Sequence, residues 1–107
     1  MKLTIQVSIA ADLDVQEIAN YILMDNSDAG MRFIPAVHQT LEGLAEFPGK
    51  GSRKFAEGLE LSGLRSYGVD GFPNHLIFYR VEPENVLQVL AVIRGARDWV
   101  RLLRRRR

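Results

Sequence analysis

The side chains that could do chemistry are mostly arginines near the C-terminal end of the chain. Residues 86–93 are apolar apart from Gln88, and Arg94 follows them directly. Residues 94–107 contain seven arginines and one aspartate, which gives a net charge of +6. Guanidinium groups bind phosphate well, but they stay protonated at physiological pH and are poor proton donors or acceptors. This segment therefore predicts anion binding rather than acid–base catalysis.

Two arginines outside that segment, Arg65 and Arg80, are expected on strands of opposite direction. They could share one face of a sheet, with Tyr67 or Tyr79 beside them. Like charges converge only when an anion or a carboxylate lies between them. The pair is therefore either an anion site or a salt-bridged scaffold, and both alternatives stay open.

The composition excludes several kinds of site. The 107 residues include no cysteine, and the two histidines, His38 and His75, lie far apart without ligand spacing. We therefore expect no metal and no cofactor. The N-terminus lacks the continuous apolar core of a signal peptide, and no stretch approaches the ~20 apolar residues of a membrane span. These features predict a cytoplasmic protein without membrane contact.

Length and charge indicate one domain with two electrostatic halves. We place the domain in residues 1–103 and expect residues 104–107 to be a flexible arginine tail. Residues 1–49 hold two basic and seven acidic side chains, a net charge of −5, whereas residues 50–107 hold twelve and six, a net charge of +6. An anionic partner is expected to dock on the second half.

The first half predicts a strand and two helices. Apolar and polar residues alternate over residues 3–9, which is typical of a strand with one buried face. A helix capped by Ser8 or Asp12 should follow and end near residues 25–26.

A second helix should begin at Ser27 or Asp28 and end before Pro48, which forms an antiparallel hairpin with the first. Its apolar stripe consists of Ala29, Phe33, Val37, Leu41 and Leu44. Pro35 lies inside this helix and predicts a kink or a later start, because proline removes a backbone donor.

The second half predicts three strands, residues 63–69, 74–81 and 86–93, in an antiparallel meander. Gly95 should let the chain turn out of the sheet into a short helix, with Asp98 in its first turn and Trp99, Leu102 and Leu103 on its apolar edge. The expected fold is α+β, with the order β-α-α-β-β-β-α and a helical hairpin packed on a four-stranded, mainly antiparallel sheet. Such a sheet would leave Ile77, Tyr79, Leu87 and Val89 incompletely covered and open to a partner.

Five groups of residues, in order along nearly the whole chain, resemble the ParE branch of the RelE/ParE superfamily of bacterial toxins. These groups are Asp14-Val15 with Ile18 and Tyr21-Ile22, Leu44 with Phe47-Pro48, Gly49 and Gly51, Leu64-Arg65, Ile77-Phe78-Tyr79-Arg80, and Gly95-Ala96-Arg97-Asp98. One position departs from the pattern, since members usually carry a histidine where this chain has Arg94.

The resemblance implies the toxin of a type II toxin-antitoxin pair, neutralised by direct binding of a cognate, ParD-like antitoxin in a hetero-oligomer. It implies DNA gyrase as the target, with DNA contacted only through the gyrase complex and with no catalysis by the toxin itself. The residues expected to bind the target are Arg65, Arg80, Arg94, Arg97, Asp98, Trp99 and Arg101. The residues expected to bind the antitoxin are Ile22, Phe33, Val37, Leu41, Ile77, Tyr79, Leu87 and Val89.

The alternative is a RelE-like endoribonuclease that cuts messenger RNA on the ribosome. Cleavage by the RNA 2′-hydroxyl needs a proton acceptor, cations to stabilise the charged phosphorane and an acid for the leaving oxygen. Cations are plentiful, but residues 98–107 contain neither tyrosine nor histidine, and His75 is expected at the start of a strand, beside a turn. The sequence therefore shows no proton-transfer group beside the C-terminal guanidiniums.

Overall fold

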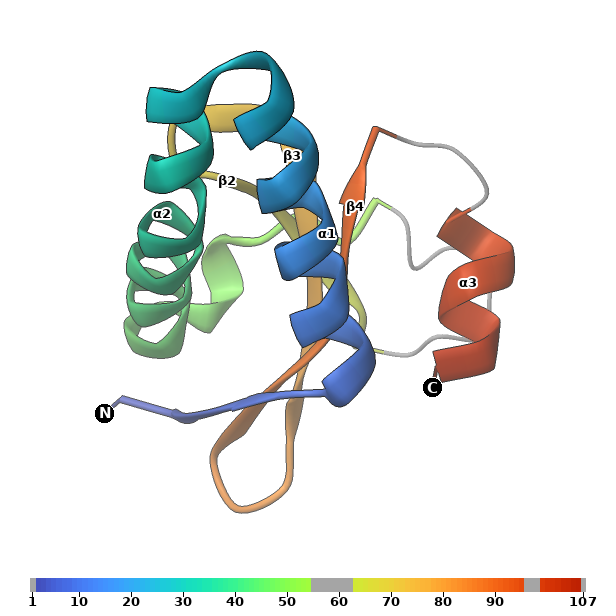
Figure 1. The fold of residues 1–107 in the computed structure, drawn as a ribbon. Helices are drawn as coiled ribbons and strands as arrows, with labels where there is room; N and C mark the ends of the chain where they lie inside the picture. The colour runs from blue at the N-terminus through green and yellow to red at the C-terminus, as the bar shows by residue number, and fades with distance from the viewer. Residues whose placement is uncertain (1, 55–62, 96–98, 107) are drawn as a thin grey trace.

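The computed structural model describes residues 2–54, 63–95 and 99–106. The elements, drawn in Figure 1, are β1 (Thr4–Val7), α1 (Ile9–Asp25), α2 (Ser27–Glu46), the 3₁₀ turn η1 (Pro48–Lys50), β2 (Arg65–Val69), β3 (Phe72–Glu82), β4 (Val86–Arg94) and α3 (Trp99–Arg106). The predicted β-α-α-β-β-β-α order and the α+β class are confirmed.

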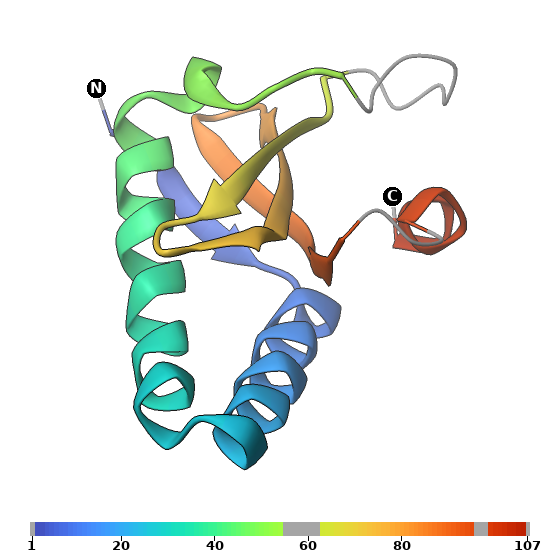
Figure 2. The ribbon, with the colours of Figure 1, turned by 90° about the horizontal axis from the view of Figure 1, so that it is seen from above.

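The strands of the described chain form one sheet in the order β1-β4-β3-β2. β1 pairs with β4 in parallel, whereas the other two pairs are antiparallel, so the sheet is mainly antiparallel as predicted. The hairpin of α1 and α2 covers one face and α3 lies on the other, as Figures 1 and 2 show. β4 is therefore covered on both faces, which explains its nearly unbroken apolar sequence.

The junction of β1 and α1 differs from the predicted strand over residues 3–9. Ser8 accepts a hydrogen bond from the backbone N–H of Ala11 at 3.0 Å, and α1 begins at Ile9. The Ile9 side chain is therefore in the first helical turn and is 83% exposed rather than buried. Of the two predicted caps, Ser8 is confirmed, because its hydroxyl oxygen satisfies one of the free donors at the helix start.

A single residue, Asn26, joins α1 to α2. Its backbone N–H donates to the carbonyl oxygen of Ile22 at 2.7 Å, and its side-chain oxygen accepts from the N–H of Ala29 at 3.0 Å. The predicted start of the second helix at Ser27 is therefore confirmed, with Asn26 as its cap. Gly30 allows the two helices to approach closely, since a Cβ there would lie 2.5 Å from the Leu23 side chain.

Pro35 neither delays nor ends α2, which runs unbroken from Ser27 to Glu46. The predicted late start is wrong. Proline removes one backbone donor, but Phe33 and Val37 on either side of it are buried. Their packing against the sheet holds the helix through the proline. The predicted end before Pro48 is confirmed.

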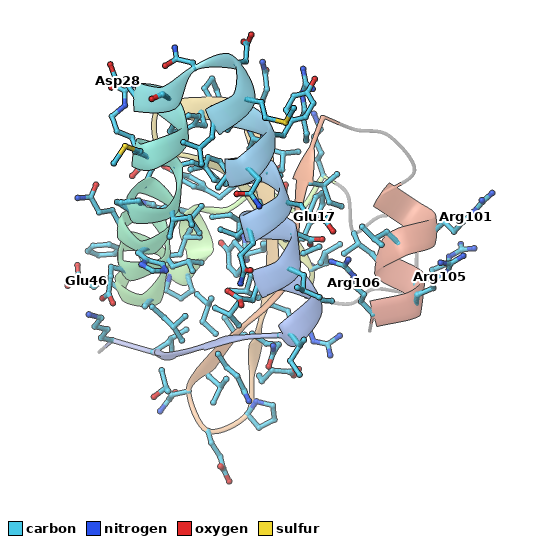
Figure 3. The ribbon with its side chains drawn as sticks, viewed as in Figure 1. Glu17, Asp28, Glu46, Arg101, Arg105 and Arg106 are labelled. Carbon is cyan, nitrogen blue, oxygen red and sulfur yellow. The ribbon has the colours of Figure 1, made fainter. Side chains whose placement is uncertain are left out.

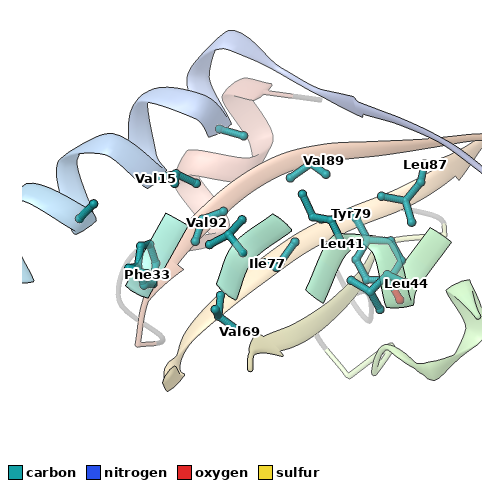
Figure 4. Packing of buried hydrophobic residues seen from close by; sticks show 13 residues of the cluster. Val15, Phe33, Leu41, Leu44, Val69, Ile77, Tyr79, Leu87, Val89 and Val92 are labelled. Carbon is teal, nitrogen blue, oxygen red and sulfur yellow. The ribbon is translucent and has the colours of Figure 1, made fainter. Parts of the chain in front are cut away.

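Two hydrophobic clusters occupy the two faces of the sheet. The hairpin-side cluster, shown in Figure 4, joins α1 and α2 to β3 and β4 and includes Val15, Phe33, Val37, Leu41, Leu44, Ile77, Tyr79, Leu87, Val89 and Val92. The α3-side cluster contains Leu64, Phe78, Leu90, Ala91 and Leu103. Leu103 is fully buried, so it anchors α3 to the sheet.

A β-bulge in β4 lets one strand supply both clusters. Tyr79 pairs with Val89 but Phe78 pairs with Ala91, so Leu90 is an extra residue in β4. Val89 then belongs to the hairpin-side cluster, while Leu90 and Ala91 belong to the α3-side cluster. The bulge also moves the register of everything beyond it by one residue.

Candidate functional site

β4 ends at Arg94, whose side chain is exposed. Gly95 follows with a φ of +70°, a conformation that favours glycine, and donates its N–H to the carbonyl oxygen of Asn74 at 2.8 Å. This confirms that Gly95 lets the chain leave the sheet. The Arg94 guanidinium lies 5.4 Å from the centroid of the Tyr21 ring on α1, which is a cation–π contact.

Arg94 borders a shallow hollow of about 190 Å³ that also contacts Glu17, Ile18, Tyr21 and His75. His75 on β3 stands directly opposite Arg94 in the sheet register. The expectation that no proton-transfer group lies beside the C-terminal guanidiniums is therefore wrong. The β-bulge is the reason, because without it His75 would be paired with Ile93.

His75 is half-buried, and its Nδ1 is enclosed without a hydrogen-bond partner among the described residues. Its ring makes edge contacts with Phe33 and Phe72 at centroid distances of 5.2 and 6.2 Å. Burial lowers the pKa of His75 below its ordinary value of 6.5, and the charge of Arg94 lowers it further. The imidazole is therefore neutral near pH 7 and is available as a proton acceptor rather than as a cation.

Arg65 and Arg80 do not form a shared site. Arg65 pairs with Tyr79 in the sheet register, so the neighbouring Arg80 points to the opposite face. The Arg65 guanidinium donates to the carbonyl oxygens of Gly51 at 2.8 Å and Gly49 at 3.4 Å. Arg80 forms an ion pair with Glu82 at 2.8 Å. Of the two alternatives, the structure supports the scaffold, since each guanidinium already has a protein partner.

The remaining residues expected to bind the target lie on or before α3. Arg101 is exposed on this helix, which begins at Trp99. Arg97 and Asp98, and the side chain of Trp99, lie outside the described residues. α3 runs from Trp99 through Arg106 and so includes three of the four residues, 104–107, that the sequence analysis expects to form a tail.

The C-terminal end of α3 is fastened to α1 and β4 by Asp14, an interaction that sequence reasoning missed. The Arg106 guanidinium donates to both Asp14 carboxylate oxygens, at 2.5 and 3.0 Å, and to the carbonyl oxygen of Leu90 at 3.3 Å. Asp14 also accepts the backbone N–H of Val92 at 3.0 Å. Both charged side chains are mostly buried, at 18% and 15% exposure.

Most of the residues expected to bind an antitoxin lie in the core of the free chain. Ile22 is half-buried, while Phe33, Val37, Leu41, Ile77, Tyr79, Leu87 and Val89 are buried. The expectation that the last four of these are incompletely covered is wrong, because α2 packs over them. Val37, Leu41 and Val89 nevertheless border a hollow of about 330 Å³ between α1, α2 and the sheet, so a partner could approach them from there.

The outer side of α1 carries apolar residues that sequence reasoning overlooked. Ile9, Leu13, Tyr21 and Met24 form this exposed α1 stripe, and their side chains are between 52% and 88% exposed. Their spacing of four, eight and three residues keeps them on one side of the helix. α1 carries apolar residues on two sides, one packed against the sheet and one exposed. A search for a single buried stripe does not distinguish the exposed side from the buried one. Exposed apolar area of this kind marks a partner surface.

No helix in the described ranges is long and apolar enough to cross a membrane. Those ranges also hold no group of three or more histidine, cysteine, aspartate or glutamate side chains placed to share a metal ion.

The chain is thus a small α+β protein, with a helical hairpin on one face of a mixed four-stranded sheet and a terminal helix on the other. A model of the ParE toxin of type II toxin-antitoxin systems (parDE) matches residues 5–99, and the chain belongs to this family. No curated protein matches it.

A solved structure titled "Chromosomal ParDE TA system from P. aeruginosa" shares the fold. The two chains superpose with a TM-score of 0.72 at 13% sequence identity, and the match covers 89% of this chain and 98% of that one. At this identity the likeness concerns the fold, and the predicted membership of the ParE branch is confirmed by the family match.

Proposed function

We propose that the protein inhibits DNA gyrase, and so blocks DNA replication, and that a cognate ParD-like antitoxin neutralises it by direct binding in the cytoplasm. Membership of the ParE toxin family supports a toxin with an antitoxin partner. The observation that carries the choice of target is the exposure of two guanidiniums of the basic C-terminal segment, Arg94 at the end of β4 and Arg101 on α3. We call these two residues the exposed cationic edge. Such an edge can hold another macromolecule without performing catalysis.

The antitoxin contacts the exposed α1 stripe and the hollow between α1 and α2. Both features involve α1, which exposes the stripe to solvent and borders the hollow through Val15, together with Val37, Leu41 and Val89. An amphipathic helix fits a groove of this kind by placing apolar residues at intervals of three and four. An extended segment of the same antitoxin pairs with an edge strand of the sheet, β1 or β2, of which β2 already bonds to Ser52 at Ser66.

The decisive experiment measures gyrase directly. Purified toxin is added to gyrase and supercoiled plasmid, and both supercoiling and the accumulation of cleaved DNA are scored. We expect inhibition with trapped cleavage, and we expect stoichiometric antitoxin to reverse it. Unimpaired supercoiling at a large excess of folded toxin would remove gyrase as the target, and topoisomerase IV treated in the same way identifies the nearest alternative.

The second candidate is a ribosome-dependent endoribonuclease, and one observation favours it. His75 lies beside Arg94 at a hollow open to solvent, so a neutral imidazole and a guanidinium adjoin one small space. A base that takes the 2′-hydroxyl proton and a cation that stabilises the phosphorane are two of the three groups that RNA cleavage requires.

Induction of the toxin in bacteria separates the two candidates. A gyrase inhibitor activates DNA-damage signalling and leaves messenger RNA intact, whereas a nuclease cuts transcripts at ribosomal A sites. His75→Gln should leave gyrase inhibition within about twofold of the parent. If transcripts are cut and this substitution abolishes cutting, the nuclease replaces the gyrase proposal.

A further inference from the structure

α3 presents three exposed guanidiniums on its outer side. We call Arg101, Arg104 and Arg105 the α3 arginine face, and Figure 3 shows Arg101 and Arg105 pointing away from the body of the protein. Within the described part of the chain, no hydrogen bond or ion pair engages any of the three. Their charge is therefore available to an external anion.

Helical spacing separates this face from the side of α3 that meets the protein. At about 100° per residue, the three arginines fall within an arc of about 100°. Leu102, Leu103 and Arg106 lie on the opposite side, where Leu103 is fully buried in the α3-side cluster. The helix is therefore divided between a docking side and a cationic side.

The orientation of α3 is held by a two-point contact. Arg106 binds both oxygens of Asp14, and Leu103 fills the cluster formed by Phe78, Leu90 and their neighbours. Rotation of α3 about its axis would break the ion pair between Arg106 and Asp14 and would expose the Leu103 side chain to solvent. The α3 arginine face is thus kept outward.

The charge and the lack of exposed apolar side chains on the α3 arginine face indicate which kind of partner it can bind. A protein interface usually has an apolar centre and a polar rim, so an arginine such as Arg101 can contact gyrase at the rim without forming the centre of an interface. An interfacial helix requires an apolar side to enter a bilayer. The described apolar residues of α3, Leu102 and Leu103, are half-buried and buried, so they serve neither purpose. A nucleic acid backbone requires only charge, because contacts to phosphate oxygens supply affinity without sequence information.

We propose that the α3 arginine face binds the phosphodiester backbone of duplex DNA directly, without recognising bases. The choice of DNA over RNA rests on the proposed gyrase function, which brings the toxin beside a DNA segment. The contact gives the toxin a hold on DNA in addition to its hold on gyrase.

The test measures binding of the purified full-length toxin, without gyrase, to a fluorescein-labelled DNA duplex over a range of salt concentrations. The variant carries Arg101→Gln, Arg104→Gln and Arg105→Gln. Loss of three phosphate contacts should reduce the slope of log K against log salt by about 2.7. For the parent, these contacts alone should make binding roughly 40-fold weaker when salt rises fourfold.

Two control variants sharpen the measurement. Lys2→Gln, Arg32→Gln and Arg53→Gln together remove the same charge from exposed positions outside α3 and should keep the parent slope. Arg101→Lys, Arg104→Lys and Arg105→Lys keep the charge and should also keep the slope. The proposal would be overturned if the glutamine control outside α3 lowered the slope of log K against log salt as much as the α3 glutamine variant does. It would also be overturned if the lysine variant lost the slope.

Other polyanions complete the test. Tighter binding to single-stranded RNA, or binding to phosphatidylserine vesicles that the α3 glutamine variant abolishes, would overturn the choice of DNA. Gyrase inhibition is scored separately on the same preparations. If gyrase is unimpaired but the salt dependence of DNA binding still falls in the α3 glutamine variant, the gyrase proposal is rejected and the DNA contact is retained. If gyrase is trapped but the salt dependence does not change in that variant, the DNA contact is rejected and the gyrase proposal is retained.

Discussion

Tyr79 joins the core to the glycine-rich turn that follows α2. Its hydroxyl donates to the carbonyl oxygen of Pro48 at 2.6 Å and accepts the N–H of Gly51 at 3.1 Å. Arg65 binds the carbonyl oxygen of the same Gly51. Burial raises the pKa of Tyr79, so the hydroxyl keeps its proton and remains a donor over the physiological range. A Cβ at residue 51 would overlap this hydroxyl, which explains the need for glycine.

Tyr79→Phe should lower the free energy of unfolding by about 1–3 kcal/mol, because it leaves the Gly51 N–H and the Pro48 carbonyl without their partner. Urea unfolding followed by circular dichroism measures the change. Tyr21→Phe removes an exposed hydroxyl and should change stability by about 0.5 kcal/mol or less. Equal effects of the two substitutions would show that the buried hydrogen bonds contribute nothing.

His75 should make stability depend on pH. Its pKa is lowered in the folded chain, so the unfolded chain binds more protons at mildly acid pH. The contribution is fully present above pH 6.5 and is lost as the pH falls from there through the lowered folded pKa. Urea unfolding between pH 5 and pH 8 measures it, and His75→Gln should flatten the curve.

A control separates titration of His75 from its packing. Phe72→Leu disturbs the ring that contacts His75, so it should lower stability at every pH while keeping the dependence on pH. A flat profile for the parent, or an unchanged slope in His75→Gln, would assign the pH dependence to other groups.

At the scale of elements, the position of α3 depends on Asp14. This carboxylate binds Arg106 on α3 and the N–H of Val92 on β4, so one residue of α1 joins three elements. Hydrogen bonds to charged groups typically contribute about 1.5–3 kcal/mol when they are shielded from water. We therefore expect Asp14 to contribute more free energy to the docking of α3 than to the stability of α1 itself.

Asp14→Ala should destabilise the protein by about 1.5–3 kcal/mol and should increase hydrogen exchange in α3 more than in α2. Mass-spectrometric hydrogen exchange resolves the two helices. Asp12→Asn changes a nearby carboxylate that accepts a hydrogen bond from Gln16, and it should leave exchange in α3 unchanged. If Asp14→Ala leaves α3 as protected as before, Leu103 alone holds the helix.

The elements could be predicted from the sequence because their patterns are local. The helical spacing of Phe33, Val37 and Leu41 and the turn at Gly95 predict α2 and the end of β4 without any knowledge of contacts. The β-bulge at Leu90 has no such local pattern, and it decides that His75 faces Arg94. The parts of the candidate site that depend on register were therefore not predictable.

Long-range polar pairing was also beyond the sequence. Asp14 and Arg106 are separated by 92 positions, and nothing local connects an acidic residue on the first helix with the arginine run at the end of the chain. An aspartate near the start of a helix is instead expected to interact with the positive end of the helix dipole. The exposed α1 stripe could not be predicted either. Its exposure depends on which side of α1 packs against the sheet, and the sequence of α1 alone does not show this.

For the whole molecule, the proposed target and antitoxin surfaces should be separable. Arg94→Ala with Arg97→Ala should reduce gyrase inhibition at least tenfold, because truncation of a central contact typically costs about 1–2 kcal/mol. It should change antitoxin affinity much less, since Arg94 contacts only Tyr21 of the exposed α1 stripe. Leu13→Glu with Met24→Glu should do the opposite, since it places charge on the exposed α1 stripe.

Inhibition of supercoiling and isothermal titration calorimetry with the antitoxin measure the two effects. Leu13, Met24 and Arg94 lie outside the buried clusters. Folding, checked by thermal unfolding, serves as the common control for both variants. A single variant that loses both activities while staying folded would show that the two partners compete for one surface.

The parallel pairing of β1 with β4 has a consequence during synthesis. Thr4 pairs with Val86, which lies 82 positions later in the chain. At about 5–20 residues per second, the ribosome needs roughly 4–16 s to make the partner after the first strand has been made. The nascent polypeptide therefore cannot complete its sheet before β4 has been made, and a truncated product that ends before β4 cannot close the fold.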